Sequence, residues 1–206
     1  MKRAGAALAF AALASSGIAK AEPVETVFGL NIAIARENGA RIVDDAWVRA
    51  QIDEANGFYV PLGYRVRWTH EDDLPEPHGE MHTRADRDAL HWRTVRTVIN
   101  VFIVRELEDV DEPGPMRMGV CWTVVKEQKT FLVVSRTAKP TVLAHELGHF
   151  FGNHVHSTVK NNLMSYDRDG ANVLLDAQQQ AIVKATAKGL LGAGVLIDVG
   201  EARRLF

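Results

Sequence analysis

The clearest chemistry in this sequence comes from two histidines one helical turn apart with a glutamate between them. These residues are His145, Glu146 and His149, in the stretch H-E-L-G-H. On a helix, positions i and i+4 lie one above the other, so both imidazoles can reach one metal ion. Glu146 lies on the flank of the pair, where it can take a proton from a water on the metal rather than occupy the metal itself. The spacing predicts a catalytic zinc site.

A catalytic zinc site takes three protein ligands and leaves one position for water. Gly152 permits the left-handed turn that ends a helix, and His154 and His156 follow it within four residues. A chain that turns at this glycine can bring a histidine back to the same metal. The residue spacing leaves both histidines open as the third ligand.

The stretch around the two histidines resembles the metzincin clan of zinc peptidases, whose pattern is HExxHxxGxxH followed by a turn that contains methionine. Here H-E-L-G-H-F-F-G matches through Gly152, and N-L-M-S-Y at residues 162–166 resembles the Met-turn. The resemblance implies that Met164 lies beneath the metal as an apolar base. It also implies a role for Tyr166, because some members have a tyrosine there that binds zinc or steadies the tetrahedral intermediate.

The sequence departs from the clan's pattern at the third histidine, which would fall on Val155. His156 is the favoured ligand, because His156-Ser157 resembles the His-Ser pair of related bacterial sequences with one residue inserted after the glycine. His154 is the alternative. A zinc peptidase with an acidic third ligand is a further possibility, and Asp167 or Asp169 would then replace the histidine.

The resemblance implies an endopeptidase that binds extended polypeptides along an edge strand, here Met118 to Val125. Such a strand can pair with a substrate through backbone hydrogen bonds. The competing interpretation is a non-catalytic or latent zincin-like module that keeps zinc for stability. Cys121 lies on the same strand, and a lone cysteine in a strand is more often a small buried apolar residue than a thiolate that silences the metal.

Hydrophobic periodicity predicts the elements that must position this site. Strands are expected at 26–36, 64–68, 98–104, 119–125 and 130–134, and helices at 44–57, 140–151 and 176–190. Residues 71–90 are expected to form a polar loop with a short helix near 84–91. The expected fold class is α+β and zincin-like: a mixed twisted sheet of about five strands, with an active-site helix, a backing helix and a C-terminal helix. The part up to about residue 152 would lie above the cleft and a smaller part, 153–206, below it.

The first 21 residues have the charged start, apolar middle and small residues near the end that are typical of a secretory signal. We therefore expect a secreted or periplasmic protein whose mature chain, 22–206, is a single catalytic domain. Removal of Lys2, Arg3 and Lys20 would change the formal net charge from -2 to -5. This balance argues against nucleic acid as a partner. No later apolar run is long enough to span a membrane, and the sequence does not set the oligomeric state.

Overall fold

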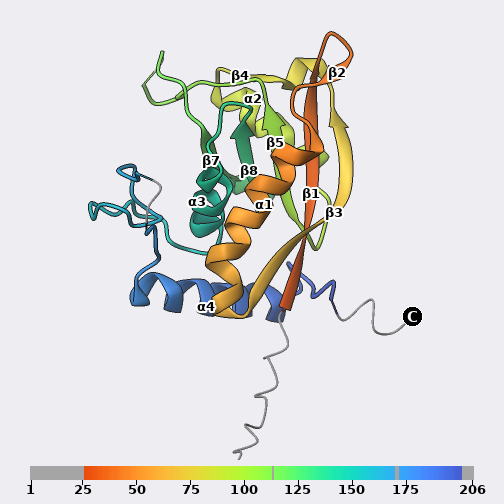
Figure 1. The fold of residues 1–206 in the computed structure, drawn as a ribbon. Helices are drawn as coiled ribbons and strands as arrows, with labels where there is room; N and C mark the ends of the chain where they lie inside the picture. Colours follow the sequence, from red (N-terminus) through yellow and green to blue (C-terminus); the bar gives the residue numbers. More distant parts are fainter. Residues whose placement is uncertain (1–25, 113, 170–171, 201–206) are drawn as a thin grey trace, which may run out of the picture.

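The protein is described by a computed structural model that covers residues 26–112, 114–169 and 172–200 (Figure 1). The expected signal segment, 1–21, lies outside the described residues. The main sheet has the strand order β2-β1-β5-β8-β7, and β3 also pairs with β1. Its strands are β1 (Thr26–Glu37), β2 (Ala40–Arg41), β3 (Tyr64–Leu74), β5 (Ile99–Val104), β7 (Gly119–Val124) and β8 (Lys129–Ser135). A second, two-stranded sheet pairs β4 (Glu80–Met81) with β6 (Glu106–Leu107).

The central strands are buried on both faces, as their continuous apolar sequences predict. Every residue of β5, I-N-V-F-I-V, is buried, and β5 lies between β1 and β8 as a parallel neighbour of both. Parallel strands that are covered on both faces have unbroken apolar sequences, whereas strands with one face in solvent alternate apolar and polar residues. β7 differs, because it pairs antiparallel with β8 and ends the sheet. The sheet is therefore mixed, and its antiparallel strand lies at the edge, as expected.

Helices cover both faces of the sheet (Figure 1). On one face, α1 (Asp45–Tyr59) lies beside α3 (Thr141–Phe150), and the hydroxyl of Tyr59 donates a 2.8 Å hydrogen bond to the carbonyl of Ala144. On the other face, a second cluster of buried apolar residues includes Leu74, Met81, Leu90 and Leu107. α4 (Ala177–Gly192) lies across the lower end of the molecule in Figure 1. The remaining helices are α2 (Arg84–Ala89), η1 (Val60–Leu62), η2 (Glu76–His78), η3 (Leu90–Arg93) and η4 (Val125–Glu127).

The predicted α+β, zincin-like class with an active-site helix, a backing helix and a C-terminal helix is confirmed. The side chains of Asp44 and Asp176 cap α1 and α4 by accepting backbone hydrogen bonds from Trp47 and Gln179. One boundary differs: β3 continues to Leu74, through residues assigned to the polar loop. Its exposed second half pairs with β1, so strand pairing rather than an apolar pattern determines its length. Within the described residues, no helix has the length and apolar character needed to cross a membrane.

Candidate metal centre

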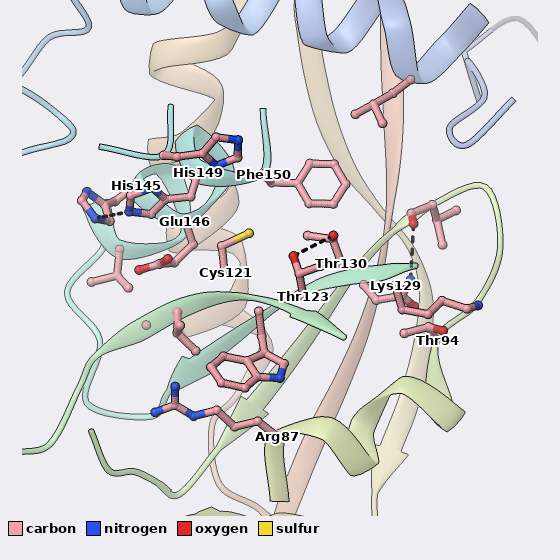
Figure 2. Close-up of a pocket in the computed structure, with 18 of the residues that line it drawn as sticks. Arg87, Thr94, Cys121, Thr123, Lys129, Thr130, His145, Glu146, His149 and Phe150 are labelled. Atoms are coloured by element: carbon pink, nitrogen blue, oxygen red, sulfur yellow. Dashed lines mark hydrogen bonds between the residues drawn. The ribbon is translucent and has the colours of Figure 1, made fainter. Parts of the chain in front are cut away.

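The helix α3 presents different residues to the core and to a cleft. Leu143 and Leu147 are buried in the main core cluster, whereas His145, Glu146 and His149 project into the cleft (Figure 2). Phe150 packs partly against that core and also lines the cleft, next to His149.

Three imidazoles converge on one point. Nε2 of His149 lies 3.2 Å from Nε2 of His145 and 3.1 Å from Nε2 of His156. Two nitrogens that bind a tetrahedral ion at about 2.0 to 2.1 Å are about 3.3 Å apart. Among the described residues, these three histidines form the group of side chains that could hold a metal ion. The observed separations therefore fit a single ion bound by all three rings.

Backbone carbonyls fix the orientation of two of these rings. Nδ1 of His145 lies 2.7 Å from the carbonyl oxygen of Leu163, and Nδ1 of His149 lies 2.7 Å from that of Asn153. A carbonyl only accepts, so each Nδ1 carries the hydrogen and each Nε2 presents a lone pair. Burial lowers the pKa of His145 to about 3 and that of His149 to about 4. Both rings are thus neutral and in the tautomer that a metal requires.

The chain reversal after α3 brings His156, rather than His154, to the other two histidines. Gly152 has a φ of +96°, and a Cβ there would lie 2.7 Å from Oγ1 of Thr186 on α4. The returning chain is held by a 2.9 Å hydrogen bond from the amide of Ser157 to the carbonyl of Met164. His154 lines the cleft but is outside the group of three.

The acidic alternatives for the third ligand, Asp167 and Asp169, are exposed and also lie outside the group of three. Asp169 pairs instead with Lys160 at 3.3 Å. The arrangement of side chains therefore favours a third histidine over an acidic ligand.

Met164 is fully buried and packs against the helix that bears the histidines. Its sulfur occupies the space that a side chain at Gly148 would need, because a Cβ built there would overlap Sδ of Met164. Gly148 lies between the two histidines of α3. The absence of a side chain at this position therefore allows the turn at 162–166 to approach the helix closely.

Glu146 is almost completely buried between α3 and the edge strand β7. Burial raises the pKa of its carboxyl to about 8, although the backbone amide of Cys121 and two nearby arginines act in the opposite direction. Gly119 on β7 provides the room, because a Cβ there would lie 2.7 Å from Oε1 of Glu146. The carboxyl is thus confined next to the histidines and can exchange a proton in the cleft.

Tyr166 stands at the mouth of the centre and is 66% exposed. Its ring lies 4.2 Å from the ring of His156, and its hydroxyl accepts a hydrogen bond from Nη1 of Arg117 at 3.3 Å. Arg117 comes from the segment that leads into β7, so this contact joins the two sides of the cleft. The residue is close enough to take part in chemistry at the three histidines.

Arg168 is a residue of the site that the sequence did not single out. Its Nη1 donates to the carbonyls of Leu163 and Ser165 and lies 2.9 Å from Nδ1 of His145. Burial lowers the pKa of its guanidinium, and the charges of Glu146 and Tyr166 raise it. No sequence motif includes an arginine two residues after a Met-turn, so only the fold shows that Arg168 lies at the site.

The three histidines open onto a cleft of about 1310 Å³ that follows the edge strand. It is lined by Gly119 to Thr123 of β7 and continues past Phe150 to Thr130, Lys129 and Thr94 (Figure 2). β8 pairs with one side of β7, and β7 ends the sheet on the other. On this open side the backbone amide of Cys121 bonds Glu146, and no other strand of the described residues pairs with β7, so the edge can accept an added strand.

Comparison with known proteins supports the assignment of the fold. No protein-family model and no curated protein matches the sequence. Among solved structures, mature mirolysin of Tannerella forsythia in complex with a cleaved peptide superposes with a TM-score of 0.58 at 9% identity, covering 83% of this chain and 98% of that one. Archaemetzincin of Methanopyrus kandleri superposes with a TM-score of 0.53 at 17% identity, covering 79% of this chain and 97% of that one. The chain therefore has the fold of the metzincin-type metallopeptidases, with three histidines clustered where a zincin-like site requires them.

Proposed function

We propose that this chain is a zinc-dependent endopeptidase, secreted or periplasmic, that cleaves polypeptides bound in an extended conformation. The observation that supports it best is the convergence of three Nε2 atoms beside the buried carboxyl of Glu146. His145, His149 and His156 would hold the ion. Among the described residues the group has three histidines and no fourth acidic, histidine or cysteine ligand, which favours a catalytic site over a closed structural one with four protein ligands.

The residues of the chain have separate tasks in this reaction. Bound zinc would lower the pKa of a water and polarise the scissile carbonyl. Glu146 takes the proton from the attacking water and passes it to the nitrogen of the leaving amine. Tyr166, with its exposed hydroxyl, would donate a hydrogen bond to the oxygen that becomes negative in the transition state.

The edge strand β7 would orient the substrate. Backbone hydrogen bonds to β7 would hold an extended peptide with one of its carbonyl groups beside the three histidines. Because these bonds do not depend on side-chain identity, peptides of different sequence would bind in the same way. One solved structure with this fold, that of mirolysin, holds a cleaved peptide. Its presence there supports a polypeptide substrate for this chain.

Substitution of Glu146 by glutamine separates this function from a zinc-binding module without catalysis. We expect Glu146→Gln to retain zinc and to cleave a denatured protein about 10² to 10⁴ times more slowly, because it removes the general base. The matched control is Glu76→Gln, an exposed glutamate of η2. Cleavage by Glu146→Gln at the wild-type rate with equal zinc would show the mechanism to be wrong.

A further inference from the structure

Two arginines line the cleft at the metal centre, and the fold neutralises only one of them. Nε of Arg117 lies 2.7 Å from Oδ2 of Asp109, and its Nη2 contacts the same oxygen. The side chain of Asp109 is only 5% exposed, so this ion pair is held within the loop before β7. The charge of Arg117 is therefore balanced by the protein itself.

Arg168 has only neutral partners. Its Nη1 donates to the carbonyls of Leu163 and Ser165, and it approaches Nδ1 of His145, which shares the Leu163 carbonyl. Among the described residues, no carboxylate forms an ion pair with it, and the adjacent Asp169 pairs with Lys160. A half-buried charge without a counter-ion is costly, and a ligand that supplies the counter-ion is favoured.

The position of Arg168 relative to Glu146 indicates which part of a substrate it would meet. Both residues line the same cleft, and Nη1 of Arg168 lies 2.9 Å from Nδ1 of His145, the residue before Glu146 on α3. In the proposed reaction, Glu146 gives its proton to the leaving nitrogen, which belongs to the residue that follows the cut. The side chain of that residue therefore enters the cleft on the side where Glu146 and Arg168 lie.

We propose that Arg168 binds the carboxylate of an aspartate or glutamate at the residue that follows the cut, so that the enzyme prefers acidic side chains at this position. This inference rests on the proposed peptidase function. One guanidinium nitrogen is used to hold the turn at 162–166, and the remaining donors of the planar fork are free for a carboxylate.

The test compares synthetic peptides that differ only in the residue after the cut: aspartate against asparagine, and glutamate against glutamine. The measured quantity is the ratio of kcat/KM within each pair, which does not depend on the fraction of active enzyme. We expect a ratio of about 10 or more for the zinc-loaded wild type, since a hydrogen-bonded charge pair contributes about 1.5 to 3 kcal/mol. The ratio should decrease with added salt.

Two variants of Arg168 and one control localise the effect. Arg168→Met should bring the ratio to about 1, and Arg168→Lys should leave it above 1 but below wild type, because a single ammonium cannot bind both oxygens in a fixed fork. Arg96→Met removes an exposed positive charge that lines the cleft two residues after Thr94, and Thr94 lies at the other end of the cleft from His145. This variant should leave the ratio unchanged.

The outcomes distinguish this inference from the function on which it rests. If the zinc-loaded wild type cleaves peptides with a ratio near 1, or if both Arg168 variants keep the wild-type ratio, the assignment of Arg168 is wrong and the peptidase function stands. If the zinc-loaded wild type cleaves no peptide, the peptidase function is wrong, and the acidic preference is rejected with it.

Discussion

Two clusters of side chains in this molecule, one of three histidines and one of a single histidine with three glutamates, have opposite chemistry. At the metal centre, His145 is buried and His149 partly buried, and both turn Nδ1 to carbonyls and have a lowered pKa. On the small sheet of β4 and β6, the ring of His82 is 43% exposed and lies 3.0 Å from Glu108, with Glu80 and Glu106 at 3.7 and 3.9 Å. The hydrogen bond to Glu108 raises its pKa, although partial burial opposes this.

The comparison shows that the surroundings of a histidine determine whether it serves as a metal ligand or as a cation. A carbonyl next to Nδ1 fixes the proton there and leaves a lone pair on Nε2, whereas carboxylates on both sides favour protonation of both nitrogens. The Nε2 atoms of three rings that converge on one point suit a bound cation. His82 already has the charges that complement it.

The largest expected effect is the loss of metal from the first cluster. His149→Ala should lower bound zinc from about one ion per chain toward none, because catalytic sites depend on all three protein ligands. His154→Ala is the matched control and should keep its zinc, since this residue lies nearby but outside the group. Metal analysis of the dialysed proteins measures the difference. Full zinc in His149→Ala, or its loss in His154→Ala, would show that the ligands are assigned incorrectly.

A smaller effect is expected when the support beneath the histidines is disturbed. Gly148→Ala forces a Cβ against Sδ of Met164, and overpacking of a core costs about 1 to 3 kcal/mol. Without such a clash, replacing a glycine inside a helix by alanine raises the free energy of unfolding by up to about 1 kcal/mol. Gly189→Ala in α4 provides that comparison, because nothing lies within 4 Å of its added Cβ.

Urea unfolding of the two glycine variants should therefore give opposite signs relative to wild type. The free energy of unfolding should decrease for Gly148→Ala and increase slightly for Gly189→Ala. An increase for Gly148→Ala would mean that the turn at 162–166 is not packed against the helix as described.

The smallest effect concerns His82 and depends on pH. Its folded pKa is raised, so the stability it contributes is fully present below the unfolded pKa of about 6.5 and is lost as pH rises through the folded value. His82→Gln should be less stable than wild type at pH 5.5 by less than about 1 kcal/mol, since the ring is exposed to solvent. The two proteins should have equal stability at pH 9. A difference that grows with pH would contradict the charge assigned to His82.

The sequence predicted those parts of the fold and site that depend on local spacing. His145, Glu146 and His149 follow from one helical turn, and the buried strand β5 follows from its apolar run. The choice between His156 and His154 could not follow from spacing, because it depends on how the chain after Gly152 returns against α4 and Met164.

Two features were missed because they depend on distant parts of the chain. The second half of β3 is polar and exposed, and it is a strand only because it pairs with β1. Arg168 belongs to the site because the turn at 162–166 folds back under α3 and places the guanidinium beside His145. In the sequence, an arginine at this position looks like any surface residue.

Gly119 limits how the edge strand β7 can be changed by mutagenesis. Any added side chain there would press on the carboxyl of Glu146. If the chain is the proposed peptidase, libraries that randomise the edge strand would therefore lose most active members at this one position. Positions 120 and 122 are different, because Val120 and Trp122 pack against the cluster on the opposite face of the sheet. Thr123 is exposed at the far end of β7 and lines the cleft, so a changed side chain there can make new contacts at the cost of the hydroxyl contact with Thr130.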